Sequence, residues 1–376
     1  MKKQYILVSC FFLILAAGCI GYFICPDKKF SEEENRYLAN KPEWSVENLF
    51  SGEFASGLDS YATDQFALRN QAILVKTLTQ KLAFVKDSNG VYFGKDNILM
   101  LKKTEEEFEE KRFKNNLSAI DSFAKLHEDV KISVLLAPTA SAIWKDKLPL
   151  GAVDYNQEEK LKQAKEYLLE NKNITFIDTY QTLSDHKNEE LYYKTDHHWT
   201  TLGAYYGYEA FCNSNALEPQ KWQKNVVTKD FYGTLYSKVQ ALNISPDEIV
   251  AIPEESLGDY TVSHENGKRV EATVYDKDKL EVKDKYQYFL GGNDGEVSIE
   301  TNVKNGKHLL VIKDSYANCF VPFLLKEYES IHLVDLRYFN ENMSMYIKSK
   351  DVNEVLVLYN LNNFDEDTSI IKLQMP

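Results

Sequence analysis

Five short apolar segments alternate with helical segments along this chain, and the alternation restricts the fold more than any other feature of the sequence. Each apolar segment has the length of a single strand, whereas the segments between them repeat their apolar residues at helical spacing. Strands that are apolar along their whole length are typical of a parallel sheet with helices packed on both faces. We therefore expect an α/β fold in three layers, α/β/α, with strands at 131–138, 174–178, 307–312, 330–334 and 352–359.

The segments around these strands predict the helices and one hairpin. The turn signal Ser88-Asn89-Gly90 precedes two short apolar runs, which predicts a hairpin over 91–101. Helical periodicity covers 104–126, 157–170, 200–213 and 316–328.

Changes of composition divide the chain into five parts. Residues 222–304 are polar and rich in Tyr, Val, Thr, Gly and Lys, with several turn signals, which indicates a β-rich insertion into the α/β domain. Such an insertion is either a substrate-binding cap or a decorated loop. The expected parts are an anchor at 1–25, a stalk and helical region at 26–87, the first part of the α/β domain at 88–221, the insertion at 222–304 and the second part of the domain at 305–376.

The N-terminal part predicts attachment to a membrane. Residues 5–25 are apolar and uncharged, and about twenty such residues are enough to cross a bilayer as a helix. Lys2 and Lys3 favour a cytoplasmic N-terminus. We expect an uncleaved signal anchor, a transmembrane helix of a single-pass protein of the cell membrane whose main domain is extracytoplasmic. Ala16-Ala17-Gly18-Cys19 resembles a lipoprotein processing site, so cleavage or lipidation at Cys19 is the alternative.

Charge and cysteine content exclude two further classes of protein. The net charge of −13 argues against nucleic acid as a partner, because nucleic acid binding requires a basic surface. The five cysteines form no disulfide framework, since only Cys212 and Cys319 lie in the body of the chain. We expect free thiols, with a single Cys212–Cys319 disulfide as the alternative.

Asp196-His197-His198-Trp199 stands where a polar loop turns into the helical pattern at 200–213. A carboxylate two positions before an imidazole can orient the ring and stabilise its charge, as a general base requires. Asp196 and His198 have this spacing, and we assign the base to His198. His197 then points in another direction, and Trp199 is either a core residue that fixes the loop or a platform for a sugar ring.

Ser315 directly follows the strand at 307–312 and is the candidate nucleophile. Reactive groups in open α/β sheets gather at the carboxyl ends of the strands, and a serine that opens a helix there lies close to backbone N–H groups. The commoner use of serine at such a position is as a helix N-cap. Asp196 and the two histidines could ligate a metal, but no HxxxH, CxxC or acidic cluster accompanies them, and we expect neither a metal nor a cofactor.

The segment YYKTDHHWTTLGAYYGYEAF at 192–211 resembles the signature of the DHHW family of bacterial surface proteins, and it is similar to the D-x-H-W segment of the alginate O-acetyltransferases. VIKDSYA at 311–317 resembles the Gly-Asp-Ser nucleophile block of the SGNH-hydrolase-like superfamily. The resemblance covers nearly all of the chain after residue 25. Other matching segments, in the expected order, are Glu34-Asn35-Arg36, DQFALR at 64–69, VYFGKDNILM at 91–100 and LLAPTASAIW at 135–144.

The resemblance implies an SGNH-hydrolase-like fold with permuted motif blocks, because the Asp/His block precedes the serine block. It also implies that Ser315 is the nucleophile, His198 the base and Asp196 the residue that orients the base. Lys313 departs from the pattern, since it replaces the glycine of Gly-Asp-Ser and leaves the backbone N–H of Ser315 as an oxyanion donor. Asn360, after the last strand, is the candidate second donor. The remaining candidate substrate contacts are His197, Trp199 and Tyr316.

The function that the resemblance implies is acyl transfer outside the cytoplasm. Ser315 would take an acetyl group from an ester or thioester and pass it to a hydroxyl of a cell-surface polysaccharide, with a multipass membrane-bound O-acyltransferase as the supplier. An acetylesterase with the same residues and a non-catalytic glycan-binding or scaffold subunit are the competing interpretations. The enzyme interpretation predicts that activity falls as pH drops through about 6.5, the ordinary pKa of histidine.

Overall fold

The computed structural model describes residues 36–265 and 267–374, and before them residues 24–31 and 33–34 and the positions 5–6, 8–9, 12–13, 16 and 20–21. About half of the apolar run at 5–25 lies outside the described residues, so the expected anchor stays a prediction. Within the described part of the chain, no helix is both long enough and apolar enough to span a bilayer. The chain forms two compact units, one built from residues 1–89 and 236–243 and the other from residues 90–235 and 244–376.

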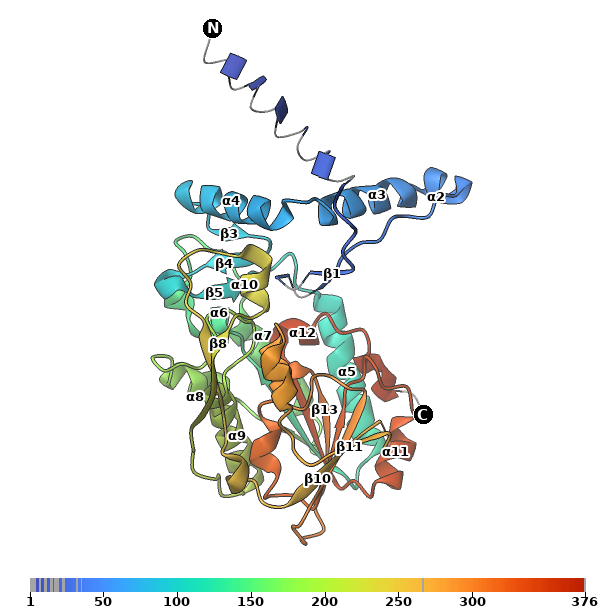
Figure 1. The fold of residues 1–376 in the computed structure, drawn as a ribbon. Helices are drawn as coiled ribbons and strands as arrows, with labels where there is room; N and C mark the ends of the chain where they lie inside the picture. The colour runs from blue at the N-terminus through green and yellow to red at the C-terminus, as the bar shows by residue number, and fades with distance from the viewer. Residues whose placement is uncertain are drawn as a thin grey trace. The chain divides into compact units, whose positions relative to one another are not determined.

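The first unit contains short strands and a row of helices (Figure 1). Its strands β1 and β2 form an antiparallel pair. The elements are β1 (Phe30–Ser31), β2 (Arg36–Tyr37), α2 (Val46–Ser51), α3 (Glu53–Asp64), α4 (Arg69–Leu82) and β3 (Asp87–Ser88).

Two arginines tie the strands of the first unit to its helices. Arg36 donates to both carboxylate oxygens of Asp64, at 2.8 and 2.5 Å, and Arg69 donates to Glu34 at 2.6 and 3.0 Å. Bidentate pairs of this kind fix orientation as well as adding energy. The segments around Glu34 and Asp64, which carry part of the family resemblance, therefore meet in an ion-pair network that holds the unit together.

An eight-stranded mixed sheet forms the centre of the second unit (Figure 1). Five neighbouring strands are parallel, in the order β14, β13, β15, β6 and β7. They confirm the five strands that the apolar segments predict. Their bounds are β6 (Lys131–Ala137), β7 (Ile174–Phe176), β13 (His308–Lys313), β14 (Ser330–Val334) and β15 (Glu354–Asn360).

Residues 222–304, expected as an insertion, contribute to this sheet. Three antiparallel strands, β12 (Glu296–Thr301), β10 (Tyr260–His264) and β11 (Arg269–Glu271), extend it beyond β14. β8 (Asn225–Phe231) and β9 (Asp247–Ala251) pair separately. The region is therefore partly continuous with the central sheet and partly an addition to it.

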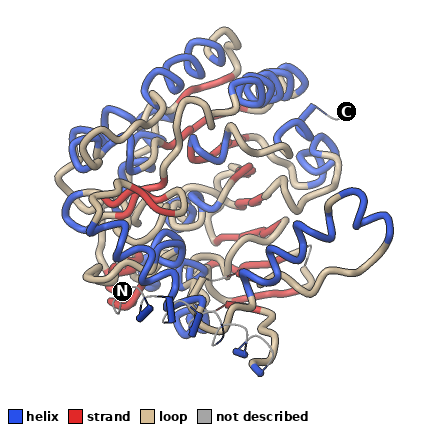
Figure 2. Tube along the Cα trace, turned by 90° about the horizontal axis from the view of Figure 1, so that it is seen from above, coloured by secondary structure: helices blue, strands red, loops and turns tan. Residues whose placement is uncertain are grey.

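The side chains of the parallel strands alternate between two apolar cores, as the period of two in a strand requires. In β6, Leu135 and Ala137 pack in one core, whereas Val134 and Leu136 pack in the other. α9 (Thr201–Asn215) contributes to the first core, and α5 (Glu110–Leu126) and α7 (Gln157–Leu168) contribute to the second. Helices thus cover both faces of the sheet (Figure 2). The described chain also contains the hairpin of β4 (Val91–Phe93) and β5 (Leu99–Leu101) and the short helices α6 (Ala140–Ile143), α8 (Tyr180–Asp185), α10 (Thr234–Val239), α11 (Met343–Ser349) and α12 (Leu361–Phe364).

Two helical predictions need correction. The helix expected from residue 104 begins at Glu110, because the carboxylate of Glu107 accepts hydrogen bonds from the backbone N–H and the hydroxyl of Thr104 and closes a local turn. The run expected at 316–328 is not an α-helix. It forms two 3₁₀ helices, η6 (Ser315–Ala317) and η7 (Val321–Leu324), since Pro322 lacks the N–H that a continuous helix would need.

The cysteines of the second unit form no bridge. Cys212 and Cys319 are both buried free thiols, so the alternative of a Cys212–Cys319 disulfide is wrong. Burial raises the pKa of each thiol to about 12. Both side chains therefore act as small apolar residues of the core.

Candidate active site

The serine turn, residues 313–317, follows β13 at the carboxyl end of the parallel strands. Its cap is Asp314, whose carboxylate accepts hydrogen bonds from the backbone N–H of Tyr316 at 2.9 Å and from the backbone N–H and side-chain amide of Asn360 at 2.9 and 2.6 Å. Burial raises the pKa of Asp314, and these donors oppose the rise. The N-cap interpretation of Ser315 is therefore wrong, since Asp314 takes that position and the Ser315 hydroxyl has a different partner.

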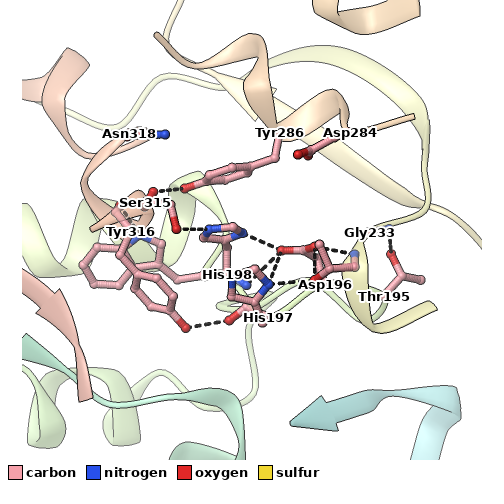
Figure 3. A network of polar contacts seen from close by, with 12 residues as sticks. Thr195, Asp196, His197, His198, Gly233, Asp284, Tyr286, Ser315, Tyr316 and Asn318 are labelled. Carbon is pink, nitrogen blue, oxygen red and sulfur yellow. Dashed lines mark hydrogen bonds and ion pairs between the residues drawn. The ribbon is translucent and has the colours of Figure 1, made fainter. Parts of the chain in front are cut away.

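That partner is His198 (Figure 3). Ser315 Oγ lies 2.7 Å from His198 Nε2, and the other ring nitrogen, Nδ1, lies 2.5 Å from Asp196 Oδ1. The structure thus brings together a hydroxyl, an imidazole and a carboxylate from segments 117 positions apart. All three residues are buried, and Ser315 is the most accessible at 9% exposure. Nucleophile, base and carboxylate stand in the order of a serine hydrolase triad.

Asp196 is held in its charged form. Burial by itself would raise the pKa of Asp196, but His197, His198 and the hydrogen bonds to the carboxylate together hold that pKa far below its ordinary value of 3.8. The backbone N–H and the hydroxyl of Thr234 donate to Oδ2 at 2.7 and 3.0 Å, and the backbone N–H of His198 donates to Oδ1 at 3.0 Å. A carboxylate that stays ionised can stabilise an imidazolium beside it.

Gly233 allows this arrangement because it has no side chain. A Cβ at position 233 would overlap the Cβ and the carboxylate of Asp196. The close approach brings the backbone N–H of Thr234 to the carboxylate. Sequence reasoning missed Gly233, and a single glycine in a polar segment offered no signal that could have found it.

A second buried carboxylate holds the start of the histidine loop, residues 195–200. Asp247, on β9, accepts hydrogen bonds from the backbone N–H groups of Lys194 and Thr195 at 2.9 and 2.8 Å and from the Thr195 hydroxyl at 2.6 Å. Burial raises the pKa of Asp247 to about 6. Two residues of the region 222–304 therefore hold the start of the histidine loop, since Asp247 binds Thr195 and Thr234 binds Asp196.

Tyr286 contacts both the base and the backbone of the nucleophile (Figure 3). Its ring stacks on the imidazole of His198, with centroids 3.8 Å apart and planes inclined by 11°. Its hydroxyl donates to the backbone carbonyl of Ser315 at 3.0 Å. Sequence reasoning missed this residue, because it is one of 24 tyrosines and nothing in its segment links it to the triad.

Trp199 and Tyr316 connect the histidine loop to the serine turn. Trp199 is fully buried and donates through Nε1 to the carbonyl of Tyr316 at 2.9 Å, and the Tyr316 hydroxyl donates to the carbonyl of His197 at 2.6 Å. A sugar platform requires an exposed ring, so the core interpretation of Trp199 is the correct one. Tyr316 is equally buried and does not present its ring to a substrate.

His197 and Asn360 take different positions around the triad. The side chain of His197 is 29% exposed, and its Nδ1 lies 2.7 Å from the Thr234 hydroxyl. The amide of Asn360 donates to Asp314, and its oxygen accepts from the backbone N–H of Asn363 at 3.0 Å. Asn360 thus supports the serine turn. Among the hydrogen bonds between described residues, none uses the backbone N–H of Ser315, which makes that group the oxyanion donor closest to the nucleophile.

Lys313, which stands where the resemblance to Gly-Asp-Ser expects a glycine, contacts two asparagines and not the triad. Its ammonium donates to Asn318 Oδ1 at 2.7 Å and to Asn293 Oδ1 at 3.1 Å. Burial lowers the pKa of Lys313 to about 8. The substitution therefore leaves the contact between Ser315 and His198 intact.

Asp196, His197 and His198 each place one potential metal ligand atom within 4.8 Å of the others. Both ring nitrogens of His198 are already engaged, one with Asp196 and one with Ser315. To bind a metal ion, His198 would have to give up one of these two hydrogen bonds. The geometry accordingly fits a hydrogen-bonded relay.

Comparisons with solved structures identify similar folds. A DHHW family protein from Eubacterium siraeum has 26% sequence identity and a TM-score of 0.64, covering 76% of this chain and 95% of that chain. Bacillus cereus PatB1, in a structure with a sulfonyl adduct, has 19% identity and a TM-score of 0.58, covering 74% and 97%. The O-acetyltransferase domain of Pseudomonas putida AlgJ has 14% identity and a TM-score of 0.49, covering 76% and 98%.

No curated protein has a significant match to the sequence. A model of the DHHW family, in contrast, matches residues 111–334, which is more than half of the chain. The matched range includes the histidine loop, the β-rich region and the serine turn. This chain belongs to the DHHW family.

Proposed function

We propose that this protein is a serine acyltransferase that acetylates a hydroxyl of a cell-surface polysaccharide. The observation that carries the proposal is the hydrogen-bonded series of Ser315 Oγ, the two ring nitrogens of His198 and Asp196 Oδ1. The resemblance of the histidine loop to the D-x-H-W segment of alginate O-acetyltransferases supports acetyl as the transferred group. Family membership and the fold shared with PatB1 are consistent with this assignment.

In the first half of the reaction, His198 Nε2 accepts the proton of Ser315 Oγ while the oxygen attacks the carbonyl carbon of an acetyl ester or thioester. The carbonyl oxygen becomes negatively charged, and the backbone N–H of Ser315 donates to it. Asp196 stabilises the imidazolium of His198. The bond to the leaving alcohol or thiol then breaks, His198 returns the proton to the leaving group, and the acetyl group remains on Ser315.

In the second half, a sugar hydroxyl attacks the acetyl-serine and gives its proton to His198. The bond between Ser315 Oγ and the acetyl carbon breaks, the proton passes to Ser315, and the new ester leaves. Water in place of the sugar would make the same site an acetylesterase. The choice between the two depends on which hydroxyl reaches the acyl-serine.

The setting of the reaction is part of the same proposal. An anchor in residues 5–25 would hold the catalytic unit at the outer face of the cell membrane, where the polysaccharide lies. A multipass membrane-bound O-acyltransferase would supply the acetyl group there. Both features come from the sequence and its family resemblance, and the covalent labelling of Ser315 does not depend on them.

The test is covalent labelling of the full-length protein with a sulfonyl fluoride, followed by peptide mass spectrometry. PatB1 carries a sulfonyl adduct, and we expect the label on Ser315. Ser315→Ala should abolish labelling and lower turnover of an activated acetyl ester by about three orders of magnitude or more. Label on another residue, or full turnover by Ser315→Ala, would leave the non-catalytic scaffold interpretation in its place.

Ser298→Ala is the matched control. Ser298 is another buried serine beside a histidine, with its Oγ 2.8 Å from His332 Nδ1, but it lies on β12 away from the serine turn. We expect Ser298→Ala to keep both labelling and turnover. Product analysis with and without an oligosaccharide then separates transferase from esterase, since a transferase acetylates the oligosaccharide and an esterase releases only acetate.

A further inference from the structure

The helices of the first unit expose apolar side chains that globular proteins normally bury. Phe50 is 87% exposed, Leu82 72% and Val75 61%. Several large apolar side chains exposed on neighbouring helices indicate a surface of interaction. The exposed set consists of Trp44 before α2, Val46, Leu49 and Phe50 on α2, Leu58 on α3, Leu68 before α4, Val75, Leu78 and Leu82 on α4, and Phe84 and Val85 after it.

The exposed side chains of α4 lie on one face of the helix. Val75, Leu78 and Leu82 are spaced by three and four residues, which places them on one side. The opposite side turns inward, where Thr77 is buried and donates to the carbonyl of Val239 in the same unit. α4 therefore has a packed face and, opposite to it, an apolar face without a covering element among the described residues.

The three helices form a linear array. They follow one another in a row (Figure 1), and short connections join them. Apolar side chains are exposed along the whole row, from Trp44 before α2 to Val85 after α4, and we call this set the apolar strip. A planar apolar boundary is the surface that such a strip fits.

We infer that α2, α3 and α4 lie on a lipid bilayer, with the side chains of the apolar strip in the interfacial region. We assign a bilayer as the binding surface because the uncharged run at 5–25, long enough to enter a membrane, precedes the strip in the same unit. Trp44, 68% exposed at the start of the row, is the residue type that prefers the membrane interface. Amphipathic helices bind there by burying their apolar faces between headgroups and acyl chains. The inference does not rest on the acyltransferase proposal.

The test uses the full chain reconstituted into phosphatidylcholine vesicles whose acyl chains carry bromine, which quenches tryptophan on contact. In a Trp44→Phe background, Phe50→Trp places a reporter on the apolar strip. Ser56→Trp places one at an exposed position of α3 on the side opposite to Leu58. The remaining tryptophans are unchanged in both variants and cancel in the comparison.

We expect the brominated lipid to quench the Phe50→Trp reporter at least about twofold more than the Ser56→Trp reporter. Equal quenching at the two positions, in protein that stays bound to the vesicles, would overturn the inference. Emission from Phe50→Trp that responds to protein concentration and not to bromine would also overturn it, because the strip would then contact a second copy of the chain. Sulfonyl fluoride labelling of Ser315 in the same samples tests the proposed function separately.

Discussion

The two halves of the triad are held by different parts of the chain. In the histidine loop, Asp196 receives hydrogen bonds from Thr234, and Tyr286 stacks on His198. Both supports come from the β-rich region 222–304. In the serine turn, Asp314 receives hydrogen bonds from Tyr316 within the turn, from Asn360 at the end of β15 and from Asn363 in α12.

The difference shows which segments of the chain position Ser315 and which position His198. The nucleophile is placed by neighbouring strands of the parallel sheet, through β13 and β15. The base is placed by irregular segments that lie outside the parallel strands. A change in residues 222–304 that touches only the histidine loop, such as one at Gly233, should therefore displace His198 while leaving the serine turn in position.

The largest effect that separates the two halves should come from Asp196→Asn. The amide cannot stabilise an imidazolium as a carboxylate does, and we expect turnover of an acetyl ester to fall about ten-thousandfold. Because the pKa of Asp196 is depressed, its contribution to stability is fully present above pH 3.8 and is lost only as pH falls toward the folded-state value. Steady-state kinetics near neutral pH measures the effect.

His197→Gln is the control for that change, since His197 is in the same loop but does not contact Ser315. We expect it to lower turnover by about tenfold or less. Equal losses in Asp196→Asn and His197→Gln would show that the loop conformation, and not the charge of Asp196, limits the reaction.

Gly233→Ala tests whether the β-rich region positions the base. The added methyl would overlap Asp196, and we expect the displaced carboxylate to lower turnover about a hundredfold. Sulfonyl labelling should still go to Ser315, only more slowly, because the serine turn is held separately. Turnover equal to that of the unmodified protein in a folded Gly233→Ala variant would contradict this view of the loop.

Tyr286 joins the two halves, and its replacement should have a smaller effect. Tyr286→Leu removes the ring stacked on His198, and we expect turnover to fall about tenfold, in line with the energy of an aromatic pair. Tyr286→Phe keeps the stack and loses only the hydrogen bond to the Ser315 carbonyl, so it should be milder. A Phe variant as impaired as the Leu variant would assign the role of Tyr286 to its hydroxyl.

Lys313, at the start of the serine turn, should affect the stability of the protein and not its turnover. Burial lowers its folded-state pKa from the ordinary 10.5 to about 8. Between these pH values the folded protein has released a proton that the unfolded chain still holds, so the free energy of unfolding rises with pH, by on the order of 3 kcal/mol in all. Lys313→Met should remove that rise in urea unfolding measured at pH 8 and at pH 10.

Exposed Lys162 on α7 provides the control for the lysine change. Lys162→Met should keep the pH dependence of the unmodified protein. An identical pH dependence in Lys313→Met would show that other groups are responsible for the rise.

The strands and the first members of the site could be predicted because their signals are local. A run such as 131–137 is apolar at every position, and Asp196 and His198 show their relation within three residues. The sequence wrongly predicted one continuous helix where η6 and η7 form, because Pro322 cannot take part in a regular α-helix. It also placed the start of α5 too early, because Glu107 closes a turn with Thr104. Tyr286, Asp247 and Gly233 could not be predicted, because they are common residue types whose partners are distant in the sequence.

The five parallel strands, the family and the pairing of Asp196 with His198 could be inferred from the amino-acid sequence alone, because their signals come from residues that are close together in the chain. The folded protein was needed to see that Ser315 meets His198 at 2.7 Å, that Asp314 and not Ser315 caps the turn, and that Lys313 extends toward Asn318. These contacts depend on where β13 ends in space, because Ser315 is 117 positions away from His198 in the sequence. The place of β13 in the sheet is set by packing between distant segments, which no short stretch of sequence records.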